Sequence, residues 1–143
     1  MLTITQRQGK AIARDKYWLT PPDLYSRLDA EHQFDFDPCT CPRPDGYNSL
    51  ILPWGQRNYV NPPFHRDDGV GGKGPTAFVR KAIAEAALGK TSVLTLPAQL
   101  YITLLLEAGA ELSSLGRVKW VHADTGEPCQ SPSPIIKAVL RPC

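Results

Sequence analysis

One apolar run between two stretches of helical periodicity constrains the fold of this chain more than any other feature. Residues 91–97, Thr-Ser-Val-Leu-Thr-Leu-Pro, have the length and continuous apolar character of a central parallel strand. The helix before this strand is predicted to run from Pro75 to Leu88, with Gly89 as its C-cap. Residues 98–109 after the strand are also expected to be helical. This alternation predicts an α/β sheet with helices on both faces.

The spacing of apolar residues also predicts which side of each helix is buried. The helix before the strand is expected to bury Phe78, Val79, Ala82, Ile83, Ala86 and Ala87, and to expose Arg80, Lys81 and Glu85. The helix after the strand is expected to place Leu100, Tyr101, Leu104 and Leu105 on one side.

Capping residues and prolines place the other elements. Thr20 is a suitable N-cap for a helix that begins at Pro21 and continues to His32. Alternating residues predict a short strand at 34–37, which Pro38 ends. Further strands are expected at 58–60, 117–122 and 135–140.

The length of 143 residues suits one domain with a hydrophobic core. Residues 1–16 are expected to form a loose arm, and residues 17–143 a single domain. A net charge of +2 permits a nucleic-acid partner without requiring one. Because no apolar run is long enough for a signal peptide or a membrane span, we expect a cytoplasmic protein without a membrane partner. The oligomeric state is left open.

The cysteines suggest neither a disulfide framework nor a metal site. In the cytoplasm thiols stay reduced, so Cys39, Cys41, Cys129 and Cys143 are not expected to pair. Cys39 and Cys41 form a Cys-x-Cys pair, but neither a Cys-x-x-Cys partner nor a nearby histidine completes a zinc site. No metal is therefore expected.

The stretch Asn61-Pro62-Pro63-Phe64 follows a predicted strand, at the sheet edge where ligands bind in open α/β folds. Such a stretch could be only a turn. It could also hold a planar amine: the Asn61 side-chain oxygen and the Pro62 carbonyl would accept its hydrogen bonds, and both prolines fix the chain without adding a donor. Phe64 would stack on a base that has been flipped out of its helix.

Several stretches resemble known sequence motifs, and their order matches as well. Asn-Pro-Pro-Phe resembles motif IV of amino-group methyltransferases that use S-adenosylmethionine. Residues 15–29, with Trp-Leu-Thr-Pro, resemble the opening of phage-type DNA N6-adenine methyltransferases, and residues 34–42 resemble the Asp-x-Cys step that follows it. Residues 115–120 and 131–140 are similar to that family's closing segments. The resemblance extends from Asp15 to Leu140.

The resemblance implies a small Rossmann-like methyltransferase, without a separate target-recognition domain, that transfers a methyl group from S-adenosylmethionine to N6 of a flipped adenine in DNA. Phages or prophages in bacterial hosts would encode it. The residues that it assigns to the cofactor are Tyr17, Trp18, Thr20, Pro21, Asp37, Pro38 and Cys39. Asn61, Pro62, Pro63 and Phe64 would form the catalytic clamp. His65, Arg66, Lys73 and Arg117 would contact DNA, and the loop from His65 to Gly74 would close over the target strand.

The same residues also fit other functions. Protein-glutamine and ribosomal-RNA guanine methyltransferases also carry Asn-Pro-Pro-Phe/Tyr, and a non-catalytic nucleic-acid-binding module derived from such an enzyme is a further alternative. The chain also lacks the Gly-x-Gly loop that many methyltransferases have after their first strand, so its cofactor affinity is an open question. Gly69, Gly71 and Gly74 have dinucleotide-binding spacing, but they do not directly follow the first strand of such a unit.

Overall fold

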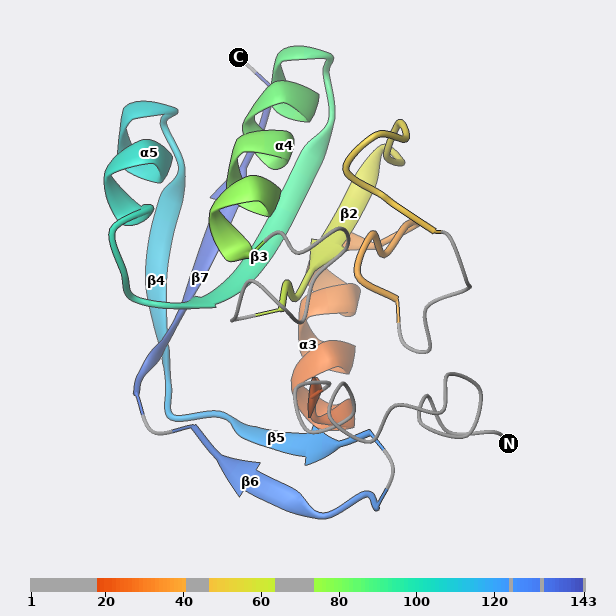
Figure 1. Ribbon diagram of the computed structural model, residues 1–143, viewed down its shortest axis with the longest axis vertical. Coiled ribbons are helices and arrows are strands. Elements are labelled where there is room, and N and C mark those ends of the chain that lie inside the picture. Colours follow the sequence, from red (N-terminus) through yellow and green to blue (C-terminus); the bar gives the residue numbers. More distant parts are fainter. Residues whose placement is uncertain (1–17, 41–46, 64–73, 124, 132, 143) are drawn as a thin grey trace.

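The computed structural model describes residues 18–40, 47–63, 74–123, 125–131 and 133–142 as a mixed α/β protein with two sheets. Figure 1 shows the larger sheet with helices packed beside it and the smaller sheet at one end. The elements are β1 (Trp18–Leu19), α3 (Pro22–His32), β2 (Arg57–Val60), α4 (Pro75–Ala87), β3 (Thr91–Pro97), α5 (Ile102–Glu107), β4 (Glu111–Gly116), β5 (Lys119–His122), β6 (Pro128–Gln130) and β7 (Ile135–Leu140).

The larger sheet has the strand order β2-β3-β7-β4. Strand β3 is central, as predicted; it pairs in parallel with β2 and antiparallel with β7, and β7 is also antiparallel to β4. The strand expected at 34–37 is reduced to one parallel bridge between Phe36 and Asn58. Pro38, which has no backbone N–H, follows almost at once and limits further pairing.

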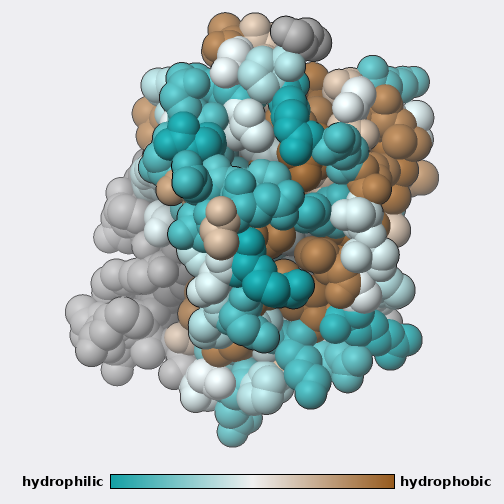
Figure 2. All heavy atoms as spheres, turned by 180° about the vertical axis from the view of Figure 1, so that it is seen from behind, coloured by the Kyte–Doolittle hydropathy of each residue, from teal (hydrophilic) through white to brown (hydrophobic). Residues whose placement is uncertain are grey.

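Helices cover both faces of the larger sheet, as predicted. On one face α4 and α5 pack over a core that includes Trp54, Phe78, Leu94, Leu105 and Leu140. On the other face α3 packs over a second core of Leu24, Leu28, Tyr59, Val118, Trp120 and Ile135. Seen from the α3 side, hydrophilic side chains cover the middle of the molecule, and hydrophobic ones gather along one edge (Figure 2).

The smaller sheet is antiparallel and has the order β1-β5-β6. It lies at the end of the larger sheet toward which β2 and β3 run (Figure 1). The sequence predicted β5 within 117–122 but neither β1 nor β6, since these have two and three residues and no apolar pattern. Within the described residues, no helix has both the length and the apolar character that crossing a membrane requires.

Several predictions about capping and burial are wrong. Lys81, expected to be exposed, is half-buried. The hydroxyl of Thr20 does not cap α3; it forms a hydrogen bond with the Tyr59 hydroxyl, and the helix begins at Pro22. Ala87, expected in the buried stripe, is exposed at the end of α4. Leu100 is 94% exposed because α5 begins only at Ile102, so the expected helix at 98–109 is shorter at both ends.

A further correction concerns Glu85, which was expected to face solvent and is 2% exposed. Its Oε1 accepts hydrogen bonds from the Trp54 amide at 2.6 Å and from Lys90 Nζ at 3.0 Å, and Lys81 lies 3.7 Å from Oε2. Burial acts to raise the pKa of Glu85, but these hydrogen bonds and nearby positive charges together lower it. The carboxylate therefore joins α4 to the segment that leads into β2.

Candidate functional site

Asp37 and Asn61 lie toward the same edge of the larger sheet. Phe36 pairs in parallel with Asn58, so Asp37 leaves the sheet on the side where β2 ends. Asn61 directly follows the last residue of β2, Val60. The two polar side chains come from positions 24 residues apart because parallel neighbours end at a common edge.

Within the described residues, the side chain of Asn61 makes a hydrogen bond through its nitrogen and none through its oxygen. Its Nδ2 donates to the main-chain carbonyl of Trp18 at 3.2 Å. Its Oδ1 is buried and accepts no hydrogen bond within the part of the chain that the structure describes. Leaving a buried acceptor unpaired costs about 1–3 kcal/mol. In open α/β sheets ligands bind at this edge, and an unpaired acceptor there is suited to a donor supplied from outside, such as an amine.

The residues after Asn61 are described only in part. Pro62 is buried and Pro63 is half-buried, and neither has a backbone N–H that could compete for the oxygen atoms nearby. Phe64 lies outside the described residues, as do His65, Arg66 and Lys73, so the expected stacking ring and the expected closing loop stay predictions.

Asp37 is a carboxylate without a basic partner in the described ranges. Its Oδ1 accepts a hydrogen bond from the Cys39 amide at 2.9 Å. Burial raises the pKa of Asp37 from its ordinary value of 3.8 to about 6, and the Cys39 amide offsets this only partly. A cationic ligand group or a pair of hydroxyls would relieve that penalty.

The charge of Asp37 reaches tyrosines that were not predicted as site residues. Burial raises the pKa of Tyr25 and of Tyr47, and the negative charge of Asp37 adds to both shifts. The ring of Tyr25 meets that of Tyr59 edge-on at 5.2 Å. A carboxylate beside aromatic rings is a favourable environment for a positively charged group. Tyr59 could have been suspected from its position, two residues before Asn61 in a strand.

The Tyr59 hydroxyl belongs to a short polar chain behind the site. It forms hydrogen bonds with the hydroxyl of Thr20 and, at 3.2 Å, with that of Thr95 in β3. Burial raises the pKa of Tyr59 to about 12, so it stays protonated at neutral pH. The hydroxyl of Thr20 therefore lies against the side chain of Tyr59 in β2, and its expected contact with the cofactor stays a prediction.

The structure also describes Trp18, Pro38 and Arg117, which were predicted as site residues. Trp18 is half-buried, and its ring meets that of His122 edge-on at 5.0 Å; Pro38 is buried next to Asp37. Arg117 is exposed between β4 and β5, and no contact joins it to Asp37 or Asn61. Tyr17 lies outside the described residues.

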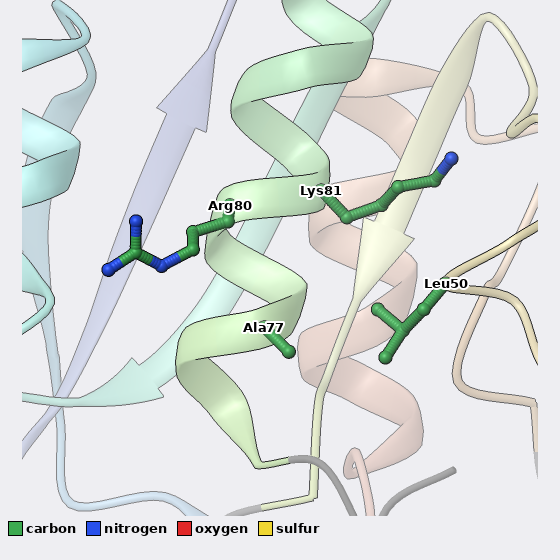
Figure 3. A pocket seen from close by; sticks show the side chains of 4 residues that line it. All are labelled: Leu50, Ala77, Arg80 and Lys81. Carbon is green, nitrogen blue, oxygen red and sulfur yellow. The ribbon is translucent and has the colours of Figure 1, made fainter. Parts of the chain in front are cut away.

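A hollow of about 500 Å³ lies beside α4 rather than at this edge, lined by Leu50, Ala77, Arg80 and Lys81. Figure 3 shows that Arg80 and Lys81 point to opposite sides of the helix. The two charges do not converge on one ligand, so the hollow is not the candidate site. In the described residues, no group of three or more His, Cys, Asp or Glu side chains could hold a metal ion.

The unpaired carboxylate gives a stability prediction for Asp37→Asn. Since folding raises the pKa from 3.8 to about 6, the folded state loses stability as pH rises through that interval. The difference corresponds to at most roughly 3 kcal/mol. Asp37→Asn should therefore be more stable than the parent by about 1–3 kcal/mol at pH 7.5 and equally stable at pH 3.5, as measured by urea unfolding.

Asp23→Asn is the matched control, because Asp23 is exposed in the first turn of α3. Its effect should stay within about 0.5 kcal/mol, the usual range for surface changes. A loss of stability in Asp37→Asn at pH 7.5 would show that the carboxylate has a stabilising partner.

Comparison with known proteins found no relative of this chain. No protein-family model matches the chain, and neither a curated protein nor a solved structure matches it.

Proposed function

We propose that this chain is a small Rossmann-like methyltransferase that uses S-adenosylmethionine to methylate N6 of adenine in DNA. The observation that carries the proposal is the buried, unpaired Oδ1 of Asn61 at the carboxyl edge of the sheet. The unpaired carboxylate of Asp37 at the same edge supports it. The motif order along the sequence supplies the choice of substrate. The protein would act in the cytoplasm of a bacterial host, encoded by a phage or prophage.

Asn61 and Pro62 would act on the target amine. The lone pair of an exocyclic amine is drawn into the ring, so the nitrogen must become more tetrahedral before it can attack a methyl group. Asn61 Oδ1 and the Pro62 carbonyl would accept the two amine hydrogens and favour that geometry. Their effect would be strongest in the transition state, which is where binding energy accelerates a reaction. The extra proton leaves readily from the methylated nitrogen, so no strong base is required.

Asp37 would hold the cofactor. The residues fit that group chemically, because a half-buried carboxylate has no cationic partner in the described residues and its charge reaches Tyr25 and Tyr47. Asp37 would accept hydrogen bonds from the cofactor's ammonium or ribose hydroxyls, while Pro38 and Cys39 shape the pocket. The cofactor supplies the methyl group, and the protein's share of the rate enhancement would be positioning of the amine against it.

The alternatives differ in what they bind and modify. An RNA-guanine or protein-glutamine methyltransferase would use the same clamp on another amine, and a non-catalytic module need not bind the cofactor. Incubation with methyl-labelled cofactor and equal amounts of DNA, RNA and a glutamine-containing peptide separates the enzymes. We expect label in DNA adenine, and label in RNA or peptide alone would replace the proposal by one of its alternatives.

Cofactor binding tests the hypothesis that this chain is an enzyme. In isothermal titration, Asp37→Ala is expected to bind S-adenosylmethionine more weakly than the parent by about 1–3 kcal/mol, which is typical of losing a hydrogen bond to a charged group. The exposed Asp23→Ala variant should bind like the parent. A folded Asp37→Ala protein with unchanged affinity would remove Asp37 from the site, and a parent that binds no cofactor would favour the non-catalytic module.

A further inference from the structure

The side-chain amide of Asn61 has two ends with different surroundings. Its nitrogen donates to the Trp18 carbonyl at 3.2 Å, and its oxygen is buried without a partner in the described residues. A carbonyl oxygen only accepts hydrogen bonds, so an amide rotated by 180° would set two oxygens against each other. The Trp18 carbonyl therefore selects the orientation in which Oδ1 is left for another donor.

The segment that carries the Trp18 carbonyl is held on more than one side. Trp18 pairs with His122 and Leu19 with Val121 across the small sheet, and the Trp18 and His122 rings are in contact at 5.0 Å. Two residues later, the Thr20 hydroxyl binds the hydroxyl of Tyr59 in β2. The Trp18 backbone thus lies between β5 and the end of β2, which Asn61 directly follows.

We propose that the main-chain carbonyl of Trp18 is the positioning group that aims Asn61 Oδ1 at the target amine, with the small sheet β1-β5-β6 as its support. This inference rests on the proposed function and gives the small sheet a role in it. Trp18 would act through Asn61 and need not touch the amine.

An Asn61→Asp variant tests this role, because an aspartate resembles the amide only when protonated. The ionised carboxylate cannot donate to Trp18 and places a negative oxygen against the carbonyl. The protonated form can donate from one oxygen and accept from the other, as asparagine does. The kcat of Asn61→Asp relative to the parent should therefore rise at least tenfold as pH falls from 8.5 to 5.5, with little change in cofactor KM.

If donation to Trp18 were unimportant, the carboxylate would remain a good acceptor at every pH. A ratio of variant to parent kcat that stays constant from pH 5.5 to 8.5 would overturn the proposal. Asn48→Asp is the matched control, because Asn48 uses its Oδ1 to accept from the Leu50 amide at 3.0 Å. A carboxylate can take over that bond, so this control should show a constant ratio.

A second measurement needs no activity and so separates this inference from the proposed function. Without cofactor or DNA, the loss of stability caused by Asn61→Asp should grow as pH rises from 5.5 to 8.5, since the ionised form is the one that opposes the carbonyl. The sign follows from linkage: a carboxyl whose pKa is raised on folding loses stability as pH rises through that pKa. A pH-independent difference would overturn the positioning role. A parent that methylates no DNA would refute the function and leave this measurement to decide the Trp18–Asn61 contact.

Discussion

Replacing Asn61 by Ala is expected to lower kcat for adenine methylation by roughly 100- to 1000-fold, the usual loss when one transition-state hydrogen-bond acceptor or donor is removed. The buried Oδ1 has no partner within the described residues, so its removal breaks no bond that the folded protein makes there with that atom. Only the hydrogen bond from Nδ2 to Trp18 is lost. Cofactor affinity should stay the same, because the acceptor acts mainly as the nitrogen becomes tetrahedral.

Single-turnover kinetics and cofactor titration on the same protein samples measure both quantities. Asn48→Ala provides the comparison, as it removes an asparagine from the loop before Trp54 and should leave kcat near the parental value. An Asn61→Ala protein that methylates adenine at the parental rate would mean that Asn-Pro-Pro-Phe is only a turn.

Replacing Glu85 by Ala is expected to destabilise the protein by about 3–5 kcal/mol, the range for removing one partner of a buried ion pair. Glu85 is 2% exposed, and the Lys90 side chain, 13% exposed, would lose the carboxylate 3.0 Å away. The buried Trp54 amide would lose its acceptor as well. Urea unfolding at pH 7 measures the change.

The pH dependence of this effect has a definite sign. Folding lowers the pKa of Glu85, so its contribution is present above the ordinary value of 4.5 and is lost as pH falls below it. The difference between Glu85→Ala and the parent should therefore shrink toward pH 3. Lys81→Met is the matched control: Lys81 lies 3.7 Å from the carboxylate, and its loss should cost less than about 1 kcal/mol. A Glu85→Ala loss no larger than that of the control would contradict the account.

The sequence predicted the elements whose pattern is repeated or continuous. Helix α4 begins at Pro75 as expected, and β3 has the expected bounds, because amphipathic spacing and an unbroken apolar run are strong signals. Strand β4 was missed, since it lies at the sheet edge, half of its residues are exposed and none is buried, and they follow no clear alternation. The buried position of Glu85 was missed because its partners, Trp54 and Lys90, come from outside the helix.

The positions of the candidate site residues along the chain could be predicted, but their contacts could not. Asp37 and Asn61 could each be placed at a strand end, because Asp37 closes one strand-like run and Asn61 follows another. The parallel bridge between Phe36 and Asn58 brings these two ends to one edge. The link from Asn61 to Trp18 could not be foreseen, since its acceptor is a main-chain carbonyl that any residue would supply. The unpaired state of Oδ1 is likewise a property of the packing around it and leaves no mark in the sequence.

Mass spectrometry of nucleosides tests the central claim most directly. DNA is incubated with the purified protein and S-adenosylmethionine that carries a deuterated methyl group, then digested and compared with DNA treated with Asn61→Ala. The account predicts deuterated N6-methyladenine with the parent protein and a rate of formation roughly 100- to 1000-fold lower with the variant. Adenine that remains unlabelled while the parent protein binds the cofactor would contradict it.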